Sequence, residues 1–512
     1  MAWTDRGSLA AYEPPHDLLD EFLVSGGDGR LTLSSDSRNA YGCTPFPQDG
    51  LIDFASSTAS SISPLAYARA RTAREELLTA SLRDGPDRAC EDASTRARQA
   101  LLGHLELNGT GAEVVFSASG TDAQLQTLFL VRLLNPGSLA TVIVGADQTG
   151  SGTAHTARGR HFSQATSSGA AVQKGGVITG LEGIGAFEIG FRDEDSSFRE
   201  PTLMDEAVLA AVEKALGSHD HVLLQAMEAS KFGWKAPSDT LLDDIAARWP
   251  GQVTIVADAC QLRITRARLK QLLVKGMLVL VTGSKFFTGP AFSGALLVPH
   301  DLAVRLADAK SPAGQLAGYA TRFDWPEAWT GLRHRFSHRF NFGQWLRWEA
   351  ALEEMRLYYA VPAGFRERMA RLFGQAMRDA ILGARHLGVV ESGFSPELPT
   401  IFPLRLTQAH EALSAEACAA IYRAMGRDLS ALEFENRALL AKPCQIGQPV
   451  ALAHSKAALR LSLSARHVRD CWSANPHRTE LNIALLRDTL STGVAKLDLL
   501  ARLYPFSDEA RA

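Results

Sequence analysis

Residues 278–290 read LVLVTGSKFFTGP, the stretch that decides the fold. Its first four residues are apolar and alternate leucine with valine, which predicts a buried strand. The strand ends at Thr-Gly-Ser, and Lys285 follows directly. Most lysines are solvated, so a surface lysine at the start of a loop is the simple interpretation. The second interpretation is a reactive lysine. Burial lowers the pKa of an ammonium group, and a neutral amine can form a Schiff base with a carbonyl.

Composition places the chain among ordinary globular proteins. It has 512 residues, of which 46% are hydrophobic and 21% charged, so a sizeable core is expected. The length allows two or more domains. The net charge of −3 offers no electrostatic basis for binding nucleic acid or an anionic membrane. We therefore expect a globular protein that binds neither nucleic acid nor an anionic membrane.

The chain shows no targeting or cross-linking pattern. Its first residues, MAWTDRGSLAAYEPPHDLLDEF, lack a basic-then-apolar signal, and no apolar run approaches the roughly 20 residues of a membrane span. The cysteines have no CxxC spacing and stand at positions 43, 90, 260, 418, 444 and 471. Neither a disulfide framework nor a metal site is expected, and the reducing cytoplasm is the expected location.

Changes in composition and hydrophobic pattern divide the chain into three parts. Residues 1–50 are polar and rich in glycine and proline, which indicates an arm. Residues 51–345 begin with a short strand in LIDFASSTASSIS (51–63) and a helical stretch at about 65–104, and they then alternate short apolar strands with helices. That alternation predicts a mostly parallel sheet covered on both faces. Residues 346–512 predict a smaller α+β domain, with strands at 401–407, 431–435 and 459–464 between helices.

Polar residues follow the strands of the middle part, and ligands of parallel sheets bind outside such strand ends. SASGTDA (117–123) opens a helix, where free N–H groups and the helix dipole favour an anion, although a simple serine cap is the alternative. VADACQ (256–261) ends an apolar strand in Asp258, a carboxylate that either meets a positive partner or caps the next turn. The 27 positions from Asp258 to Lys285 suffice for one strand–helix–strand step, so the two ends are expected to be neighbours.

Together these segments resemble the fold-type-I pyridoxal-phosphate enzymes, above all the class V aminotransferase and cysteine desulfurase branch. In that family a phosphate loop, a ring-stacking residue, Asp-Ala-x-Gln/His and Ser-x-x-Lys follow one another. This chain shows Ser-Gly-Thr at 119–121, Asp-Ala-Cys-Gln at 258–261 and Thr-Gly-Ser-Lys at 282–285. The resemblance covers about residues 50–470 and rests on the ordered set. It implies a large three-layer α/β domain with a mostly parallel sheet, followed by a smaller C-terminal α+β domain.

The resemblance also implies roles for individual residues. Lys285 would form the Schiff base with pyridoxal 5'-phosphate and move the α-proton of the substrate. Asp258 would keep the ring nitrogen protonated, and Gln261 would hydrogen-bond the ring hydroxyl. The remaining residues would hold the phosphate group: Ser119, Gly120, Thr121, Thr282 and Ser284.

Two contacts of the family have no clear counterpart. A histidine usually stacks on the ring soon after the strand that corresponds to TVIVGAD (141–147). Here Gln148 follows that strand, and the nearest histidine, His155, lies in an apparent insertion at 148–200. We expect His155 to stack on the ring, with Gln148 as the alternative and a solvated loop histidine as the simple interpretation. Where the family often has an asparagine before the aspartate, MEASKFGW offers Ser230.

The C-terminal part supplies candidates for the substrate. The family holds the substrate carboxylate with an arginine, whose fork binds bidentately, and LRLSLSARH (459–467) offers Arg466 and Arg460. Either arginine is a surface residue in the simple interpretation. Cys444 lies where desulfurases carry a nucleophilic cysteine, but the local sequence KPCQIGQPV (442–450) does not match the desulfurase loop. We therefore expect the Gly-Gln-Pro turn in this segment to shape the substrate entrance. The segment Asn341-Phe342-Gly343 resembles the one with which a dimer partner reaches the phosphate in this family, and the resemblance implies a homodimer.

These expectations combine into a pyridoxal-phosphate enzyme that acts on an amino acid through Lys285. A lyase of the cysteine desulfurase type, which cuts a C–C or C–S bond, is the first hypothesis, and a class V aminotransferase is the second. A binding module that has lost catalysis is the third, and the presence of both Lys285 and Asp258 argues against it. The expected partners are an amino-acid substrate and a second copy of the chain, and neither nucleic acid nor a membrane.

Overall fold

The computed structural model describes residues 18–193, 197–310, 316–431 and 436–506. The first seventeen residues of the predicted arm lie outside this set, as does the predicted strand at 431–435 beyond Ala431. None of the helices in the described ranges is long and apolar enough to cross a membrane.

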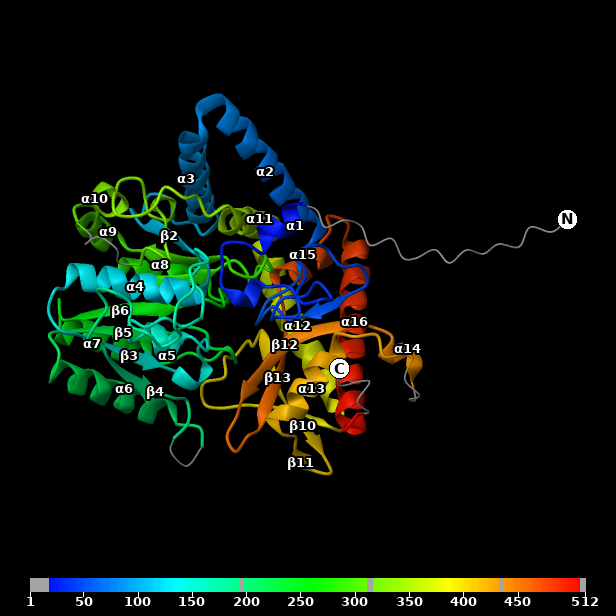
Figure 1. The fold of residues 1–512 in the computed structure, drawn as a ribbon. Coiled ribbons are helices and arrows are strands. Elements are labelled where there is room, and N and C mark those ends of the chain that lie inside the picture. Colours follow the sequence, from blue (N-terminus) through cyan, green and yellow to red (C-terminus); the bar gives the residue numbers. More distant parts are fainter. Residues whose placement is uncertain (1–17, 194–196, 311–315, 432–435, 507–512) are drawn as a thin grey trace.

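A seven-stranded sheet forms the large part of the molecule (Figure 1). Its strand order is β2-β8-β7-β6-β5-β3-β4, and the run from β7 to β4 is parallel. Strand β8 is antiparallel to both of its neighbours. The strands are β2 (Glu113–Ser117), β3 (Leu139–Val144), β4 (Gly185–Ile189), β5 (His221–Met227), β6 (Val253–Asp258), β7 (Leu278–Thr282) and β8 (Gly294–Val298).

Both faces of this sheet are buried, which explains why its strands read as continuous apolar runs. Side chains alternate between the faces, so Val114 packs into one hydrophobic cluster and Val115 into another. Figure 1 shows α4 and α6 on opposite sides of the strands. The first cluster includes α3, α6, α7, α8 and α11, whereas the second includes α4, α9 and α10. Their bounds are α3 (Pro86–His104), α4 (Gly120–Leu134), α6 (Pro201–Leu216), α7 (Asp239–Arg248), α8 (Arg266–Val274), α9 (His300–Ala307), α10 (Thr330–Arg333) and α11 (Phe342–Tyr359).

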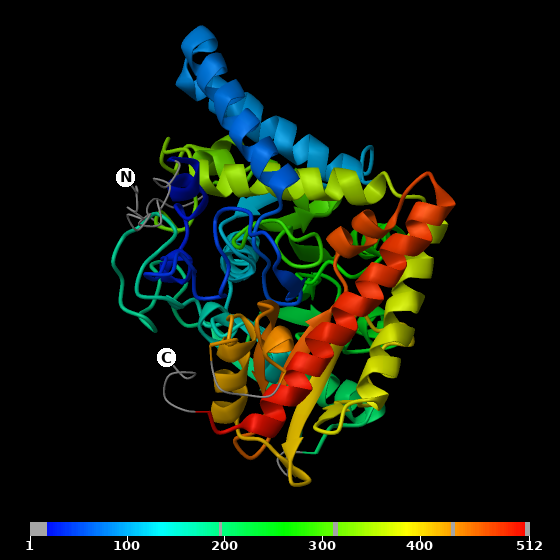
Figure 2. The same ribbon diagram turned by 90° about the vertical axis from the view of Figure 1, so that its right-hand side faces the viewer.

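A second, smaller sheet has its own hydrophobic cluster and contains β1, β12, β13, β10 and β11 in that order, with β9 paired to β10. Helices α12 and α16 lie side by side against it (Figure 2). The strands are β1 (Ile52–Phe54), β9 (Leu387–Val389), β10 (Ile401–Gln408), β11 (Glu411–Ala412), β12 (Cys444–Ala451) and β13 (Ala457–Ser462). The helices of this region are α12 (Ala363–Leu382), α13 (Ala415–Met425), α14 (Arg437–Leu440), α15 (Ala465–Cys471) and α16 (Pro476–Leu503). The predicted mixed α/β fold with a second, smaller sheet is thereby confirmed.

Two segments differ from the sequence-based expectations. The helical stretch predicted at 65–104 is a hairpin of α2 (Pro64–Asp84) and α3, which projects from the body of the molecule (Figures 1 and 2). Gly85 separates the helices with a φ of +84°, a conformation that glycine adopts without strain, and Pro86 opens α3. The apparent insertion at 148–200 is also partly ordered, since it contributes the edge strand β4.

The remaining short elements complete the chain. They are α1 (Leu18–Leu23), α5 (Thr153–Thr156) and three 3₁₀ turns at Gly29–Leu31, Ala146–Gln148 and Arg322–Asp324. The predicted domain division into 1–50, 51–345 and 346–512 stays a prediction. Position 345 lies in the first turn of α11, and β1 pairs with β12 of the second sheet.

Candidate functional site

A cavity of about 380 Å³ lies at the carboxyl ends of β6 and β7, beside the N-terminus of α4. This edge of a parallel sheet is the usual position for ligands. Many of the residues predicted from the sequence line the cavity: Ser119, Gly120, Thr121, Asp258, Thr282, Ser284, Lys285 and Arg460. The parallel pairing of β6 and β7 brings the segments of Asp258 and Lys285 to the same edge.

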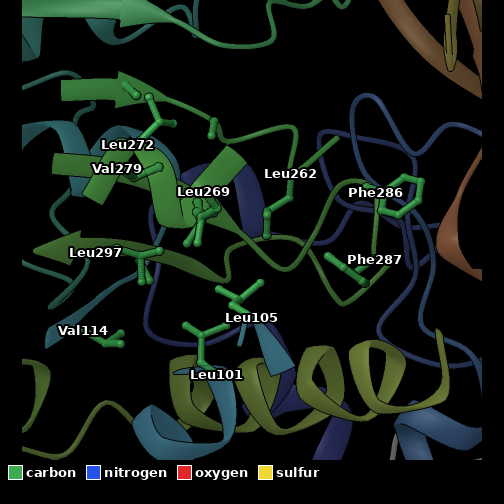
Figure 3. Packing of buried hydrophobic residues seen from close by; sticks show 14 of the residues in the cluster. Leu101, Leu105, Val114, Leu262, Leu269, Leu272, Val279, Phe286, Phe287 and Leu297 are labelled. Carbon is green, nitrogen blue, oxygen red and sulfur yellow. The ribbon is translucent and has the colours of Figure 1, made fainter. Parts of the chain in front are cut away.

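Lys285 is held by a tight loop that is anchored in the core. Two aromatic residues follow it, and Figure 3 shows both Phe286 and Phe287 among the buried side chains. Their rings contact Tyr358 of α11 with centroids 5.3 and 5.5 Å apart. A Cβ at Gly283 would lie 2.5 Å from Ala351, so only glycine permits this approach of α11. In the described part of the chain the Lys285 ammonium has no hydrogen-bond or ion-pair partner.

Asp258 is buried, and its carboxylate meets only uncharged donors. One oxygen accepts the backbone N–H of Cys260 at 3.0 Å, and the other accepts the side-chain amide of Gln124 at 3.3 Å. The amide oxygen of Gln124 accepts the hydroxyls of Thr153 and Thr156 at 3.0 and 3.2 Å, which turns its nitrogen toward Asp258. Among the residues that the structure describes, Asp258 has no cationic partner within ion-pair distance. A buried carboxylate of this kind favours a positively charged or N–H donor from a ligand.

The N-terminus of α4 forms the anion-binding side of the cavity. Ser119 caps the helix, because its hydroxyl accepts the N–H of Asp122 and also donates to that carboxylate. Burial raises the pKa of Asp122 to about 7. The first N–H groups of a helix have no intrahelical partners, and here they border the cavity at Gly120 and Thr121. A Cβ at Gly120 would lie 2.9 Å from the Cys260 sulfur, so a larger residue here would press on this buried thiol.

The hydroxyl of Thr282 donates to the carbonyl oxygen of Cys260 at 2.7 Å and so ties the end of β7 to the segment after β6. This bond fixes the distance between the segments that carry Asp258 and Lys285. The thiol of Cys260 also lines the cavity, and burial together with the charge of Asp258 raises its pKa well above the usual range. Cys260 is therefore a protonated thiol at neutral pH.

Several of the residues considered from the sequence lie outside the cavity lining. His155 is in the short helix α5, and Gln148 accepts the hydroxyl of Ser230 at 2.6 Å. Gln261 donates to the carbonyl oxygen of Ser57 at 3.0 Å. Arg466, in the first turn of α15, donates to two carbonyl oxygens and lies 3.5 Å from Glu354. The roles assigned to His155, Gln261 and Arg466 stay predictions.

The structure adds lining residues that sequence reasoning missed, and they come from several distant segments: Arg30, Tyr41, Ser57, Thr58 and Lys231. The hydroxyl of Ser57 is buried without a hydrogen-bond partner in the described chain. Arg30 pairs with Asp28 at 2.7 Å and lies over the ring of Phe292. Sequence reasoning considered only Ser230 in the segment MEASKFGW. The next residue, Lys231, is the signal that could have revealed this part of the cavity wall.

Cys444 lies away from the cavity. It is in β12, opposite Ile52 of β1, and belongs to the hydrophobic cluster of the second sheet. Burial raises the pKa of its thiol to about 12, although the nearby Lys496 acts in the opposite direction. A buried, protonated thiol is a poor nucleophile. Gln448, from the same segment, does line the cavity. The turn expected here is wrong, because residues 444–451 form strand β12 with a register shift between Gly447 and Val450, and the role of the segment at the entrance stays a prediction.

The groups around the cavity fit pyridoxal phosphate. The free amine of Lys285 suits the aldehyde, and the Asp258 carboxylate, which lacks a cationic partner in the described chain, suits a protonated ring nitrogen. The α4 N-terminus and the nearby hydroxyls suit the phosphate group.

No protein-family model matches the chain, and no curated protein matches it. Solved structures do match. The cysteine desulfurase CsdA from Escherichia coli is 11% identical with a TM-score of 0.51, and the match covers 88% of this chain and 97% of that chain. A phosphoserine aminotransferase from Cytophaga hutchinsonii is 13% identical with a TM-score of 0.48, covering 86% and 99%. Oryza sativa TDC, solved with PLP and tryptamine, is 14% identical with a TM-score of 0.47, covering 87% and 84%.

Identities this low show the fold alone. The similarity to CsdA over most of both chains agrees with the mixed α/β architecture of a large, mostly parallel sheet and a smaller second sheet. What the site binds and which reaction it performs have to be inferred from its own residues.

Proposed function

We propose that the protein is a pyridoxal-phosphate-dependent enzyme that acts on an amino acid, with the cofactor bound in the cavity and attached to Lys285. One observation carries the proposal. Three groups border the same cavity at the carboxyl edge of the sheet: an amine and a buried carboxylate, neither of which has an ion-pair partner within the described ranges, and a helix N-terminus. These three groups match the aldehyde, ring nitrogen and phosphate of the cofactor.

The bound cofactor supplies an electron sink for negative charge at the α-carbon of the amino acid. Asp258 holds the proton on the ring nitrogen, and the hydrogen bonds from Cys260 and Gln124 keep its carboxylate in place. Gly120 and Thr121 present backbone N–H groups to the phosphate, with Ser284 beside them in the cavity wall. When it is not bonded to the cofactor, the Lys285 amine would accept the proton of the α-carbon, since within the described ranges it has no hydrogen-bond or ion-pair partner that would hold it elsewhere.

We propose a lyase that cuts a C–C or C–S bond of the amino acid, in the desulfurase-like branch of class V. The ordered motifs at 119–121, 258–261 and 282–285 support this branch. The burial of Cys444 speaks against a persulfide on that residue, so the proposed lyase releases its fragment without transfer to Cys444.

Class V aminotransfer is the second candidate. It needs no protein thiol, and the thiol that lines the cavity, Cys260, is kept protonated by burial and by Asp258. An incubation with an amino acid and no oxo acid distinguishes the two reactions. Accumulation of pyridoxamine phosphate supports aminotransfer, whereas sustained product release supports the lyase.

The proposal also includes a cytoplasmic homodimer and the division into an arm, a cofactor-binding domain at 51–345 and a small domain at 346–512. The position of Asn341 in the family pattern supports the dimer. The separate hydrophobic cluster of the second sheet supports the small domain. Light scattering of the purified protein measures the assembly.

Borohydride reduction tests the proposed attachment site. Protein loaded with pyridoxal phosphate, reduced and digested, is expected to carry the cofactor on Lys285 in peptide mass spectra. Lys285→Ala is expected to lose the label, and Lys231→Ala, which removes the other lysine of the cavity, is expected to keep it. A label that maps to Lys231 or to any residue other than Lys285 contradicts the proposal.

A further inference from the structure

Lys231 and Arg460 place two positive charges in the wall that faces the second sheet. Lys231 follows β5 in a tight turn, in which the Ser230 N–H donates to the Trp234 carbonyl at 2.8 Å and the Ser230 carbonyl accepts from Gly233 at 2.9 Å. The backbone N–H of Lys231 donates to the carbonyl oxygen of Gln148 at 3.3 Å. The backbone of this lysine is therefore fixed, and its side chain reaches the cavity.

The guanidinium of Arg460 is fully used by the protein. Nε and Nη2 donate to the carbonyl oxygen of Gln448 at 3.2 and 3.0 Å, and Nη2 also donates to the hydroxyl of Thr58 at 2.7 Å. Nη1 donates to the carbonyl oxygens of Ser57 and Lys231 at 3.3 and 3.2 Å. These bonds account for the five N–H groups of an arginine side chain. Arg460 thus contributes a buried positive charge but has no donor left for a substrate.

The ammonium of Lys231 is in the opposite situation. It has no hydrogen-bond or ion-pair partner within the described ranges, so its three donors are available. Burial, followed by the charges of Arg460 and Lys285, lowers its pKa to about 8, and Asp147 acts in the opposite direction. Two neighbouring cations without an anion between them are unfavourable in a buried wall unless a ligand brings negative charge.

The charges that line the cavity do not balance without a ligand. Asp258 is the one carboxylate among its described lining residues, and the proposed function assigns it to the ring nitrogen of the cofactor. Arg30 already has Asp28 as its partner. The phosphate of the cofactor also brings negative charge, but the proposed function assigns it to the N-terminus of α4, in the wall that contains Gly120 and Thr121. In the wall that contains Lys231 and Arg460, the α-carboxylate of an amino acid would neutralise one of the two remaining charges. A second anionic group on the substrate would neutralise the other.

Resting on the proposed function, we propose that Lys231 determines specificity by donating to an anionic group of the substrate, and that the substrate is an amino acid with an acidic side chain. Arg460 acts as a positioning residue, because it holds the carbonyl oxygen of Lys231 and adds its charge without contacting the substrate through a free donor. Carboxylate and sulfinate side chains share the required chemistry.

Matched pairs of amino acids test this specificity. The holoenzyme is titrated with aspartate against asparagine, glutamate against glutamine, and cysteine sulfinate against cysteine, and binding is followed by the change in the visible spectrum. A hydrogen bond to a charged group contributes about 1.5–3 kcal/mol, so the acidic member is expected to bind about 10- to 100-fold more tightly. In Lys231→Met this ratio is expected to fall to about threefold or less.

Two further variants complete the test. Lys231→Arg keeps a charged donor and is expected to restore most of the ratio. Lys235→Met is the matched control, since Lys235 pairs with Asp239 outside the cavity lining, and it is expected to leave the ratio unchanged. An unchanged binding ratio in Lys231→Met overturns the inference. An equal loss of affinity for the acidic member and its partner in each pair also overturns it, because a group that binds the α-carboxylate, which all these amino acids share, gives no preference.

Borohydride labelling of Lys285 separates this inference from the function on which it rests. Labelled wild-type protein that shows no acidic preference overturns the role of Lys231 and leaves the proposed function standing. Wild-type protein that cannot be labelled overturns both.

Discussion

The cavity has two walls that are built in different ways. The strand-end wall consists of 119–121, Asp258 and 282–285, and its polar groups bond to neighbours along the chain or on the next strand. The second-sheet wall consists of 57–58, Lys231, Gln448 and Arg460, and its bonds join residues far apart in the sequence.

The two walls also differ in charge. The strand-end wall carries a carboxylate and an amine, both signs of charge, which suits a cofactor with a basic ring nitrogen and an aldehyde. The charged side chains of the second-sheet wall, among its described residues, are both cationic. Changes in the strand-end wall are therefore expected to affect turnover, whereas changes in the second-sheet wall are expected to affect the choice of substrate.

The largest effect after loss of Lys285 is expected for Asp258→Ala in the strand-end wall. Without the carboxylate the ring nitrogen loses its proton partner, and turnover is expected to fall by about 100- to 10,000-fold. Steady-state rates at saturating cofactor measure this loss, and circular dichroism checks that the fold is retained. Turnover equal to that of the wild type would sink the role of Asp258.

A pH dependence is expected for the second-sheet wall. The pKa of Lys231 is lowered to about 8 by burial and by the charges of Arg460 and Lys285, against the opposing charge of Asp147. The ammonium is present below that pH and is lost above it, so the preference for acidic amino acids is expected to decline as the pH rises through about 8. Because arginine stays protonated, Lys231→Arg is expected to keep a flat ratio over the same range. If the ratio of acidic to uncharged binding fell equally in the wild type and in Lys231→Arg over this pH range, Lys231 would not be the titrating group.

The smallest effect is expected for Cys444→Ala, which lies in the second sheet but outside both walls. Loss of the buried sulfur is expected to lower the free energy of unfolding by about 1 kcal/mol, comparable to a small core truncation. Turnover is expected to stay within about twofold, because Cys444 does not border the cavity. Denaturant unfolding and steady-state rates check the two parts. A large loss of turnover in a folded variant would restore Cys444 as a candidate acceptor.

Much of the large sheet could be predicted from the sequence, because its strands are buried on both faces and read as short apolar runs. The apolar runs HVLLQAM (221–227) and VTIVAD (253–258) form β5 and β6, in keeping with the predicted alternation of strands and helices. Strand β8 is harder to predict, although GALLV is apolar, because it follows β7 after a short loop and not after a helix. Helices α2 and α3 look like one stretch in the sequence because their compositions are alike across Gly85.

The sequence by itself determined which residues form the strand-end wall. Each of its segments is a local pattern, in which an apolar strand is followed by Ser-Gly-Thr, by Asp or by Ser-Lys, and parallel strands bring such ends to one edge of the sheet. Only the tertiary structure decided which of the two cations, Lys231 or Arg460, has hydrogen-bond donors that no described residue of the protein occupies. In the sequence Arg460 looks like an available donor, but carbonyl oxygens from residues 57, 231 and 448 occupy most of its N–H groups, while the ammonium of Lys231 has none of these partners. Which charges are paired depends on contacts between residues hundreds of positions apart, and periodicity and local motifs carry no record of such contacts.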